Sequence, residues 1–520
     1  MKKTLPMFSR ATEADVCLLL EGTYPYVFGG VSSWVNHLLA AYPEVRFSLV
    51  FMGSQPADYG KPVYQLPENV VSYAEYFIHD PVPREPVREA LKGDPEAFAT
   101  SERFHQALRD PQQHEMVASL MRQLLPMMEK GESLSDHQFL HGKKSWETVT
   151  DSYERYCTDP SFTDYFWTVR LMHKPIWDIV RISQTIIPAR VYHTVSTGYA
   201  GFLGALLHYR TGRPLLLSEH GIYTKERKID LLQSTWLRDN RRYLEEDATR
   251  VGYLQDLWVR FFQSLGSMCY HASDTIVSLF ELNRQRQIQD GAPVERTQVI
   301  PNGIEISRFS PLRAQRLVEI PRVVALVGRV VPIKDVRTFI RAIFIASRQL
   351  PELQGWIIGG EEEDPEYAYE CRSFAGSLGI LHTQVQFLGH QRVDHFYPKV
   401  GLVALSSISE GQPLVILEAF AAGVPVVATD VGACRELIEG REASDRELGT
   451  AGRVVPLANP EALATAMLAL LGDVECWRSA QAVALERVTR YYDSHVMENR
   501  YRELYARLMD SSTEPVIQRG

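Results

Sequence analysis

Two glutamates in the second half of the chain stand at a spacing that could hold a polyhydroxylated ligand. Glu410 and Glu418 belong to the string SSISEGQPLVILEAFAAGVPVVAT, residues 406–429, which predicts a strand, a loop, a helix and a second strand in that order. Pro413 can open the helix, because proline lacks the N–H that the first turn leaves unused, and Gly423 ends it. We therefore expect both carboxylates in the first turns of one helix, near its positive end.

The chemistry that this string favours is the binding of hydroxyl and phosphate groups. A carboxylate accepts hydrogen bonds from a sugar hydroxyl or from a ribose diol, while the N–H groups at a helix start can hold a phosphate. The ligand contacts that we expect here are Glu410, Gly411, Pro413, Leu414 and Glu418. Surface glutamates are the ordinary interpretation of either residue alone, but the complete string in its strand–loop–helix–strand frame favours a site.

Two cations follow a predicted strand earlier in the same half of the chain. Arg329 and Lys334 lie in VGRVVPIKD, residues 327–335, around a turn that contains Pro332. Two positive side chains in one loop at the carboxyl end of a strand suit a diphosphate. Their charge would also stabilise a diphosphate that leaves during a reaction. The alternative is a pair of solvated surface cations.

Further candidates lie in the first half and at the junction of the halves. Gly29 and Gly30 in FGGV follow the first strand, where missing side chains let the backbone approach a ligand at a helix start. His220 in SEHGIY stands at a strand end and could hydrogen-bond a sugar hydroxyl; a satisfied structural histidine is the alternative. His193 has a similar position, which we interpret as structural. Asn302 in IPNGI is interpreted first as part of a hinge turn and second as a ligand contact.

Composition and charge limit the classes of protein. The chain has 520 residues, of which 45% are hydrophobic and 23% charged, and its formal net charge is −9. This length predicts two or three domains, and the acidic balance argues against a nucleic-acid partner. The 6 cysteines show no metal or disulfide spacing, which fits a reducing compartment. With no signal peptide and no apolar run of about 18 residues, we expect a cytoplasmic protein without a transmembrane segment, able to dock on a membrane complex.

Alternating strands and helices predict an α/β fold with parallel sheets. The expected strands are residues 16–20, 46–52, 189–194, 215–220, 274–280, 298–300, 323–327, 355–358, 385–388, 402–406, 426–429 and 452–455. We predict two Rossmann-like, doubly wound domains, residues 1–300 with a helical insertion at about 80–170 and residues 301–490, and a C-terminal helix in 491–520 that packs back on the first domain. Ligands bind beyond the carboxyl ends of such strands, so the expected site is a cleft between facing domains.

Motifs of several other enzyme classes are absent from the sequence. There is no Asp-x-Asp triplet to hold a diphosphate through a metal, no P-loop, no HExxH and no GxSxG. The GxxGxxG of Gly198, Gly201 and Gly204 is not the dinucleotide fingerprint and predicts close packing of a helix. The acidic run Glu361–Asp364 predicts a solvated loop rather than a metal site. We expect neither a metal nor a cofactor.

The string SEGQPLVILEAFAAGVPVVAT resembles the Glu-x7-Glu signature of the family-4 retaining glycosyltransferases, and GRVVPIKD and IPNGI match further motifs of that family. The resemblance implies the two-domain fold named GT-B and a nucleotide-diphosphate sugar as donor. It implies that Glu410 contacts the donor sugar and that Glu418 holds the ribose. It also implies that Arg329 and Lys334 bind the diphosphate, with Gly29–Gly30 against it and His220 on the sugar.

Two first-half strings, LLLEGTYPYVFGGVSSWVNHLL and SEHGIYTKERKIDL, are similar to the cytosolic glycosyltransferases of Pel exopolysaccharide synthesis. That resemblance implies UDP-glucose as donor, a growing polysaccharide of the biofilm matrix as acceptor, and docking on an inner-membrane synthase complex that cyclic-di-GMP regulates. Glycogen and starch synthases carry a lysine two residues before their paired glycines, whereas this chain has Val27. A bacterial glycogen synthase is therefore disfavoured.

The hypothesis is metal-independent transfer of a hexose with retention at the anomeric carbon. Two alternatives remain open. The first is a nucleotide-sugar epimerase, which also uses paired Rossmann domains and which the Glu-x7-Glu string disfavours. The second is a non-catalytic subunit that binds a sugar nucleotide and acts as the scaffold of a membrane synthase.

Overall fold

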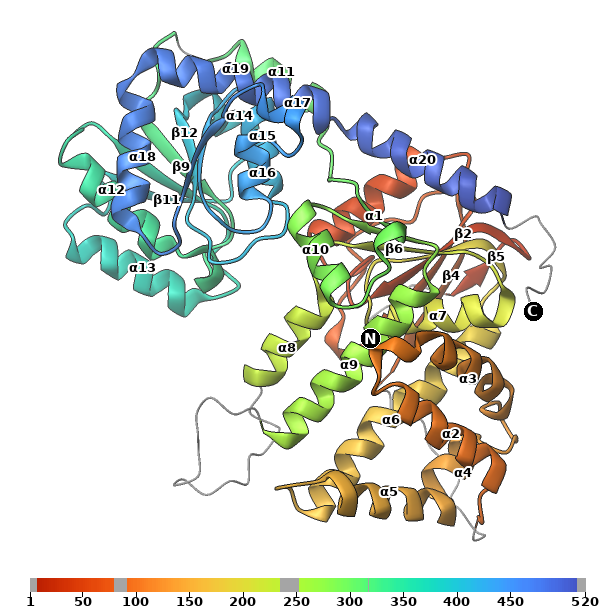
Figure 1. Ribbon diagram of the computed structural model, residues 1–520. Coiled ribbons are helices and arrows are strands. Elements are labelled where there is room, and N and C mark those ends of the chain that lie inside the picture. Colours follow the sequence, from red (N-terminus) through yellow and green to blue (C-terminus); the bar gives the residue numbers. More distant parts are fainter. Residues whose placement is uncertain (1–6, 79–90, 234–251, 317, 512–520) are drawn as a thin grey trace. The chain divides into compact units, whose positions relative to one another are not determined.

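A computed structural model describes residues 7–78, 91–233, 252–316 and 318–511 (Figure 1). Contacts within the chain divide it into two compact units. The first comprises Met1–Ser278, Arg284–Gln298 and Tyr501–Gly520, and the second comprises Leu279–Asn283 and Val299–Arg500. In the described part of the chain, no helix combines the length and the apolar composition that crossing a membrane requires.

The first unit is built on an eight-stranded sheet with the order β1-β4-β3-β2-β5-β6-β7-β8. The strands are β1 (Phe8–Ser9), β2 (Ala14–Glu21), β3 (Phe47–Gly53), β4 (Val70–Phe77), β5 (Ala189–Thr194), β6 (Leu215–Glu219), β7 (Thr275–Ser278) and β8 (Thr297–Val299). The central strand β2 pairs in parallel with β3 and β5, and Val16 faces Phe47 on one side and Val191 on the other. Such strands are buried on both faces, so they consist of continuous apolar runs.

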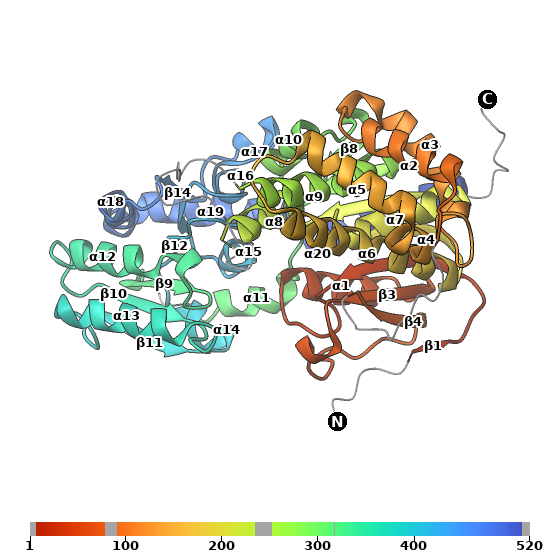
Figure 2. The same ribbon diagram turned by 90° about the horizontal axis from the view of Figure 1, so that it is seen from below.

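Helices of the first unit fall into a group that follows the strands and a group inserted between β4 and β5. The first group is α1 (Gly30–Ala41), α7 (Tyr199–Thr211), α8 (Tyr223–Gln233), α9 (Tyr253–Ala272) and α10 (Glu281–Gln289). The inserted group is α2 (Pro95–Ala107), α3 (His114–Met127), α4 (Asp136–His141), α5 (Lys143–Tyr156) and α6 (Phe162–Thr185). In Figures 1 and 2, α7 and α9 lie side by side.

Small residues explain the close packing of α7. A Cβ added to Gly201 would lie 2.9 Å from the Sγ of Cys269 on α9, and one added to Gly204 would lie 2.8 Å from the Cδ1 of Leu215 on β6. The GxxGxxG of the sequence therefore serves helix packing, as expected.

The second unit has a six-stranded, wholly parallel sheet with the order β11-β10-β9-β12-β13-β14. Its strands are β9 (Val323–Val327), β10 (Gln354–Ile358), β11 (Val385–Gly389), β12 (Leu402–Leu405), β13 (Val426–Thr429) and β14 (Gly452–Val455). The strand order reverses between β9 and β12. In open α/β sheets, the crevice at such a reversal is the place where ligands bind.

Helices cover both faces of this sheet. They are α11 (Ile306–Arg313), α12 (Val336–Ser347), α13 (Pro365–Ser377), α14 (Val393–Phe396), α15 (Leu414–Ala421), α16 (Cys434–Glu439), α17 (Ala443–Arg446), α18 (Pro460–Gly472) and α19 (Val474–Tyr491). The last helix, α20 (Ser494–Ser511), belongs to the first unit from Tyr501 onward. Successive strand residues point to opposite faces, so Val324 and Leu326 of β9 join one apolar cluster while Ala325 joins another. On one face α12 and α18 lie side by side (Figures 1 and 2).

The expected α/β fold with two mostly parallel sheets is confirmed, with differences in detail. The strands β1 and β4 have no counterpart among the expected strands. The edge strand β1 has only two residues, and VVSYAEYF of β4, between β1 and β3, mixes polar and apolar residues. The expectation of one helix over about 231–266 is met only by the end of α8 and by α9, and residues 234–251 lie outside the described residues.

A buried ion pair ties α19 to the segment around α17. Arg487 is fully buried, and its Nε donates to Oδ1 of Asp445 over 2.5 Å. The remaining guanidinium nitrogens donate to the backbone carbonyls of Ile438, Asp445 and Gly449 at 2.6–2.8 Å. Each nitrogen of the Arg487 guanidinium therefore donates a hydrogen bond, and a buried ion pair is tolerated when its groups are hydrogen-bonded in this way.

We expect Arg487→Met to lower the free energy of unfolding by about 3–5 kcal/mol, because it leaves the Asp445 carboxylate buried without its cation. Urea denaturation of the purified chain measures this change. Arg490→Met is the matched control on the same helix, since Arg490 pairs with Glu486 at the exposed surface and such pairs contribute about 0–1 kcal/mol. Equal losses of unfolding free energy in the two variants would contradict a structural role for the buried Arg487–Asp445 pair.

Candidate functional site

The loops that follow β9 and β12 meet at the strand-order reversal of the second unit. Lys334 closes a short 3-10 turn, Pro332–Lys334, after β9, and its Nζ lies 2.6 Å from Oε1 of Glu410 in the loop after β12. Two further hydrogen bonds join the loops: Ile408 N donates to Ile333 O over 2.9 Å, and Ser406 Oγ donates to Lys334 O over 2.9 Å. Lys334 and Glu410, which the sequence motifs assign to a diphosphate and to a sugar, therefore lie in direct contact.

The loop that carries Glu410 is held on its other side by the next strand. Ser407 Oγ donates to Oε1 of Glu410 over 2.6 Å, and Thr429 Oγ1 at the end of β13 donates to Ser407 O over 2.7 Å. A Cβ on Gly432 would lie 2.3 Å from the carbonyl oxygens of both Glu410 and Gly411. Only glycine fits there, so the carboxylate occupies a preorganised position.

The helix that follows begins later than expected. Pro413 is the residue before the first turn of α15, and Leu414 is its first helical residue. Glu410 therefore lies in the loop, and the expectation that both glutamates stand in the first turns of one helix is wrong for Glu410. The first N–H groups of a helix have no acceptor within it and carry the positive end of its dipole. Gly411, Pro413 and Leu414 thus form a start that suits an anion.

Glu418 lies in the second turn of α15 and belongs to a different environment from Glu410. Its Oε2 accepts a hydrogen bond from the hydroxyl of Tyr397 over 3.2 Å. Burial raises the pKa of this carboxyl above its ordinary value, and the Tyr397 hydrogen bond and the charge of Arg308 oppose that shift. A carboxylate in this half-buried position can accept hydrogen bonds from a diol.

Arg329 is more exposed than the pair at the strand-order reversal. Its side chain is 60% accessible and forms an ion pair with Glu363. Glu361 of the same acidic run pairs with Arg372, whose Nη2 lies 2.6 Å from Oε1. The run is exposed, as expected, with the Glu362 and Glu363 side chains 79% and 53% accessible, but one of its carboxylates also pairs with the cation that was assigned to a diphosphate. A phosphate at Arg329 would have to replace Glu363.

Asn302 reaches the same region through its backbone. Its N–H donates to Oε1 of Gln412 over 2.7 Å, directly before Pro413, and Asn302 Oδ1 is buried without a hydrogen-bond partner among the described residues. The following Ile304 N donates to Tyr492 O over 2.8 Å, which fixes the turn. Sequence reasoning missed Gln412, although its place between Gly411 and Pro413 was a signal.

The candidates of the first unit lie at the carboxyl edge of its sheet. His220 follows β6 and packs against the indole of Trp34 on α1, with ring centroids 4.6 Å apart. Burial lowers the pKa of His220 to about 4, so its imidazole is neutral at pH 7. Gly29 precedes α1 and Gly30 begins it, and a Cβ on either would meet no atom within 4 Å. Packing therefore does not require glycine there, and the space beside them is open.

Buried polar atoms without partners gather on the elements of this edge. Among the described residues they include Thr23 Oγ1, Ser32 Oγ, Trp34 Nε1 and His220 Nε2. An unpaired buried polar atom costs stability, so each calls for a water or a ligand. By contrast, both nitrogens of His193 are paired over 2.8 Å, with Tyr505 and with Ser218, as its structural interpretation expects. No local sequence pattern distinguishes Thr23, Ser32 or the indole of Trp34 from ordinary buried residues.

Two α/β sheets with helices on their faces, and ligand-type side chains at the strand-order reversal, define the GT-B class of fold. Solved structures of that class agree over nearly the whole chain. HepE from Anabaena, in complex with UDP and glucose, has a TM-score of 0.54 at 16% identity and covers 95% of this chain and 99% of its own. Sucrose-phosphate synthase from Thermosynechococcus elongatus has a TM-score of 0.56 at 16% identity, covering 96% and 100%.

The chain belongs to the family described as "Domain of unknown function (DUF3492)", whose model matches residues 14–295. Residues 321–473 match the model described as "Glycosyl transferases group 1". This second match contains Arg329, Lys334, Glu410 and Glu418.

Curated relatives match parts of the chain. An exopolysaccharide phosphotransferase of Streptomyces coelicolor is 32% identical over 249 residues, which are 47% of this chain and 24% of that protein. A D-inositol 3-phosphate glycosyltransferase of Nocardia farcinica is 32% identical over 223 residues, 40% of this chain and 47% of that protein. The chain thus spans less than half the length of either relative.

We expect His220 to make the stability of the protein depend on pH. A histidine whose pKa falls from about 6.5 in the unfolded chain to about 4 in the folded protein loses stability as the pH drops through that interval, because the unfolded state binds the proton first. Between pH 7 and pH 5 this contribution is about 1–2 kcal/mol. In urea denaturation at both pH values, His220→Gln should therefore lose about 1–2 kcal/mol less than the unsubstituted chain. An identical loss in both proteins would count against a neutral, desolvated His220.

Proposed function

We propose that this protein is a retaining glycosyltransferase that moves a hexose from a nucleotide-diphosphate sugar to a growing polysaccharide. The observation that carries the proposal is the Lys334–Glu410 contact of 2.6 Å at the strand-order reversal of the second unit. It joins a cation that suits a phosphate to a carboxylate that suits a sugar hydroxyl. Both residues lie within the segment that matches group 1 glycosyl transferases.

In this proposal the diphosphate lies at the start of α15. The N–H groups of Gly411 and Leu414 and the ammonium of Lys334 provide positive charge, and Arg329 contributes after exchanging Glu363 for phosphate oxygen. This charge stabilises the diphosphate as its bond to the anomeric carbon breaks. Since the protein supplies the charge, transfer needs no metal.

The two glutamates take different parts of the donor. Glu410, held by Lys334 and Ser407, orients the sugar and supports the positive charge that develops on its ring. Glu418, beside the Tyr397 hydroxyl, accepts hydrogen bonds from the ribose diol. The acceptor hydroxyl forms its bond to the anomeric carbon on the face from which the diphosphate departs, and a diphosphate oxygen takes the proton. In the first unit, neutral His220 hydrogen-bonds a sugar hydroxyl.

The donor that we propose is UDP-glucose, and the product is Pel exopolysaccharide of the biofilm matrix. Support comes from the first-half strings that resemble Pel glycosyltransferases, from HepE, which binds UDP and glucose in a structure of the same fold, and from a relative named for exopolysaccharide. The protein would then act in the cytoplasm, docked on an inner-membrane synthase complex.

A panel of nucleotide sugars tests the donor. A ligand at one hundred times its Kd stabilises the folded state by about 2.7 kcal/mol, so UDP-glucose should raise the unfolding temperature more than UDP-galactose, UDP-N-acetylglucosamine or ADP-glucose. Product analysis with the preferred donor separates the alternatives. Transfer of glucose to an oligosaccharide, with EDTA present, supports the proposal; formation of an epimer, or binding without turnover in the presence of partners and acceptors, replaces it with one of the rivals.

Lys334→Ala should reduce kcat for transfer by about 10²–10³, because the leaving diphosphate loses a charged contact. The matched control is Lys399→Ala, which removes an exposed ammonium of the same unit and should leave kcat unchanged. Circular dichroism and thermal unfolding verify that both variants fold. Turnover of Lys334→Ala at the rate of the control would reject the diphosphate assignment.

A further inference from the structure

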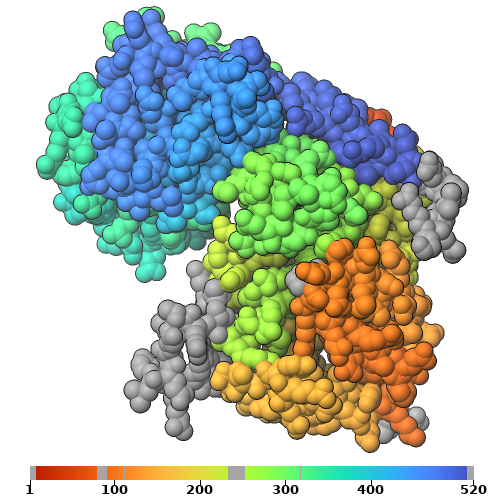
Figure 3. All heavy atoms as spheres, viewed as in Figure 1, coloured from red at the N-terminus to blue at the C-terminus, as the bar shows by residue number. Residues whose placement is uncertain are grey.

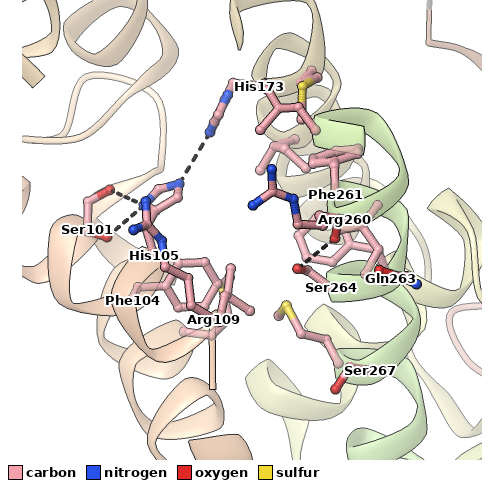
Figure 4. Close-up of a pocket in the computed structure, with 18 of the residues that line it drawn as sticks. Ser101, Phe104, His105, Arg109, His173, Arg260, Phe261, Gln263, Ser264 and Ser267 are labelled. Atoms are coloured by element: carbon pink, nitrogen blue, oxygen red, sulfur yellow. Dashed lines mark hydrogen bonds between the residues drawn. The ribbon is translucent and has the colours of Figure 1, made fainter. Parts of the chain in front are cut away.

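A large pocket lies inside the first unit, between the inserted helices and α9. It encloses about 1130 Å³, slightly more than the roughly 300–1,000 Å³ of common small-molecule sites. Figure 4 shows Ser101, Phe104, His105 and Arg109 on one wall and Arg260, Phe261, Gln263, Ser264 and Ser267 of α9 on the other. In Figure 3 the same inserted helices, in orange, lie against the green α9 segment.

The floor of this pocket is apolar. Its aliphatic and sulfur-containing side chains include Met121, Leu124, Met128, Leu134, Met172, Ile176, Leu265 and Met268. Leu124, for example, is only 2% exposed. Methionine is flexible and polarizable, so a wall rich in it adapts to ligands of variable shape. The surface therefore suits a hydrocarbon chain.

Histidines in the wall add polarity without charge. Nδ1 of His105 donates to Ser101 O and Nδ1 of His173 donates to Val169 O, each over 2.7 Å. In the neutral rings the two Nε2 atoms, which are 3.2 Å apart, are therefore both acceptors. Burial, followed by proximity to His105, lowers the pKa of His173 to about 4, and burial also lowers the pKa of His105. His271 stacks on His114 with centroids 4.1 Å apart, and its pKa is likewise lowered to about 4 by burial. At pH 7, His105, His173 and His271 therefore provide little positive charge for an anion.

Lasting positive charge in the lining comes from two arginines near the exposed side of the pocket. The guanidinium carbon of Arg109 lies 4.0 Å from the ring centroid of Tyr156, which leaves its N–H edges available. Arg260 pairs with Asp256 over 2.7 Å, but their side chains are 56% and 50% exposed. An exposed pair of this kind is weak, so an anionic ligand can compete with Asp256. The acidic lining residue Asp290 is itself paired with Arg286 over 3.0 Å.

We propose that this pocket binds a single-chain amphiphile with an anionic head group, the chain in the methionine-rich floor and the head between Arg109 and Arg260. The apolar volume calls for a chain, and the charge at the mouth calls for an acidic head rather than a neutral or cationic one. All the lining residues belong to the first unit. The proposal therefore stands apart from the nucleotide-sugar site proposed in the second unit and survives if that function fails.

Calorimetry with octyl, decyl and dodecyl phosphate, each below its micelle-forming concentration, tests the proposal. Affinity should increase about fourfold for each added methylene, as burial of hydrocarbon requires. Decanol and decyltrimethylammonium should bind more weakly than decyl phosphate, and inorganic phosphate should not bind. Affinity that does not depend on chain length, equal binding of decanol and decyl phosphate, or binding of inorganic phosphate alone overturns the assignment.

Substitutions locate the binding. Arg109→Gln and Arg260→Gln should each weaken decyl phosphate about fivefold and leave decanol unchanged, while Arg155→Gln, an exposed arginine of α5 outside the lining, should have no effect. Leu124→Trp should fill the floor and abolish binding of all chains. If circular dichroism shows that Leu124→Trp is unfolded, the binding of decyl phosphate to the arginine variants tests the proposal instead. Unchanged binding in both arginine variants overturns the proposal, and Lys334→Ala should bind decyl phosphate normally whether or not the protein is a glycosyltransferase.

Discussion

The contact between Lys334 and Glu410 is the interaction on which the site of the second unit depends. It joins two loops that are 76 residues apart in the chain, and it can form only because β9 and β12 are neighbours in the sheet. Backbone hydrogen bonds and the glycine at position 432 fix both loops before any ligand arrives. In a site whose side chains are already ordered, little of the binding free energy is lost to ordering them when a ligand binds.

The sequence predicts the placement of a side chain well when that placement depends on a single strand or helix. Lys334 follows a strand, Glu410 follows another, and Pro413 precedes a helix, so their placement at carboxyl ends could be predicted from local patterns. That β12 lies beside β9 could not, because the strands β10 and β11 intervene in sequence and only packing decides the order. The step from candidate residues to a defined contact therefore required the structure.

Other features left no local signal. Glu363 belongs to an acidic run that looks solvated, and only the approach of two loops reveals Arg329 as its partner. Trp34 has the spacing of an ordinary apolar helix face, yet its indole nitrogen is buried without a partner among the described residues. The inserted helices show the same difficulty on a larger scale. An amphipathic helix has the same sequence pattern whether its apolar face lines a filled core or a cavity.

The pairing of Arg329 with Glu363 has a consequence for ligand selectivity. The carboxylate keeps the guanidinium neutralised when no ligand is bound, so a free inorganic anion gains only the difference between two similar contacts. Under the proposed function, a donor that is bound elsewhere in the site would bring its phosphate to Arg329 at a high local concentration and would displace Glu363. The exposed ion pair would then compete with phosphate for the guanidinium, and this competition would favour a phosphate that is part of a bound donor over a free one.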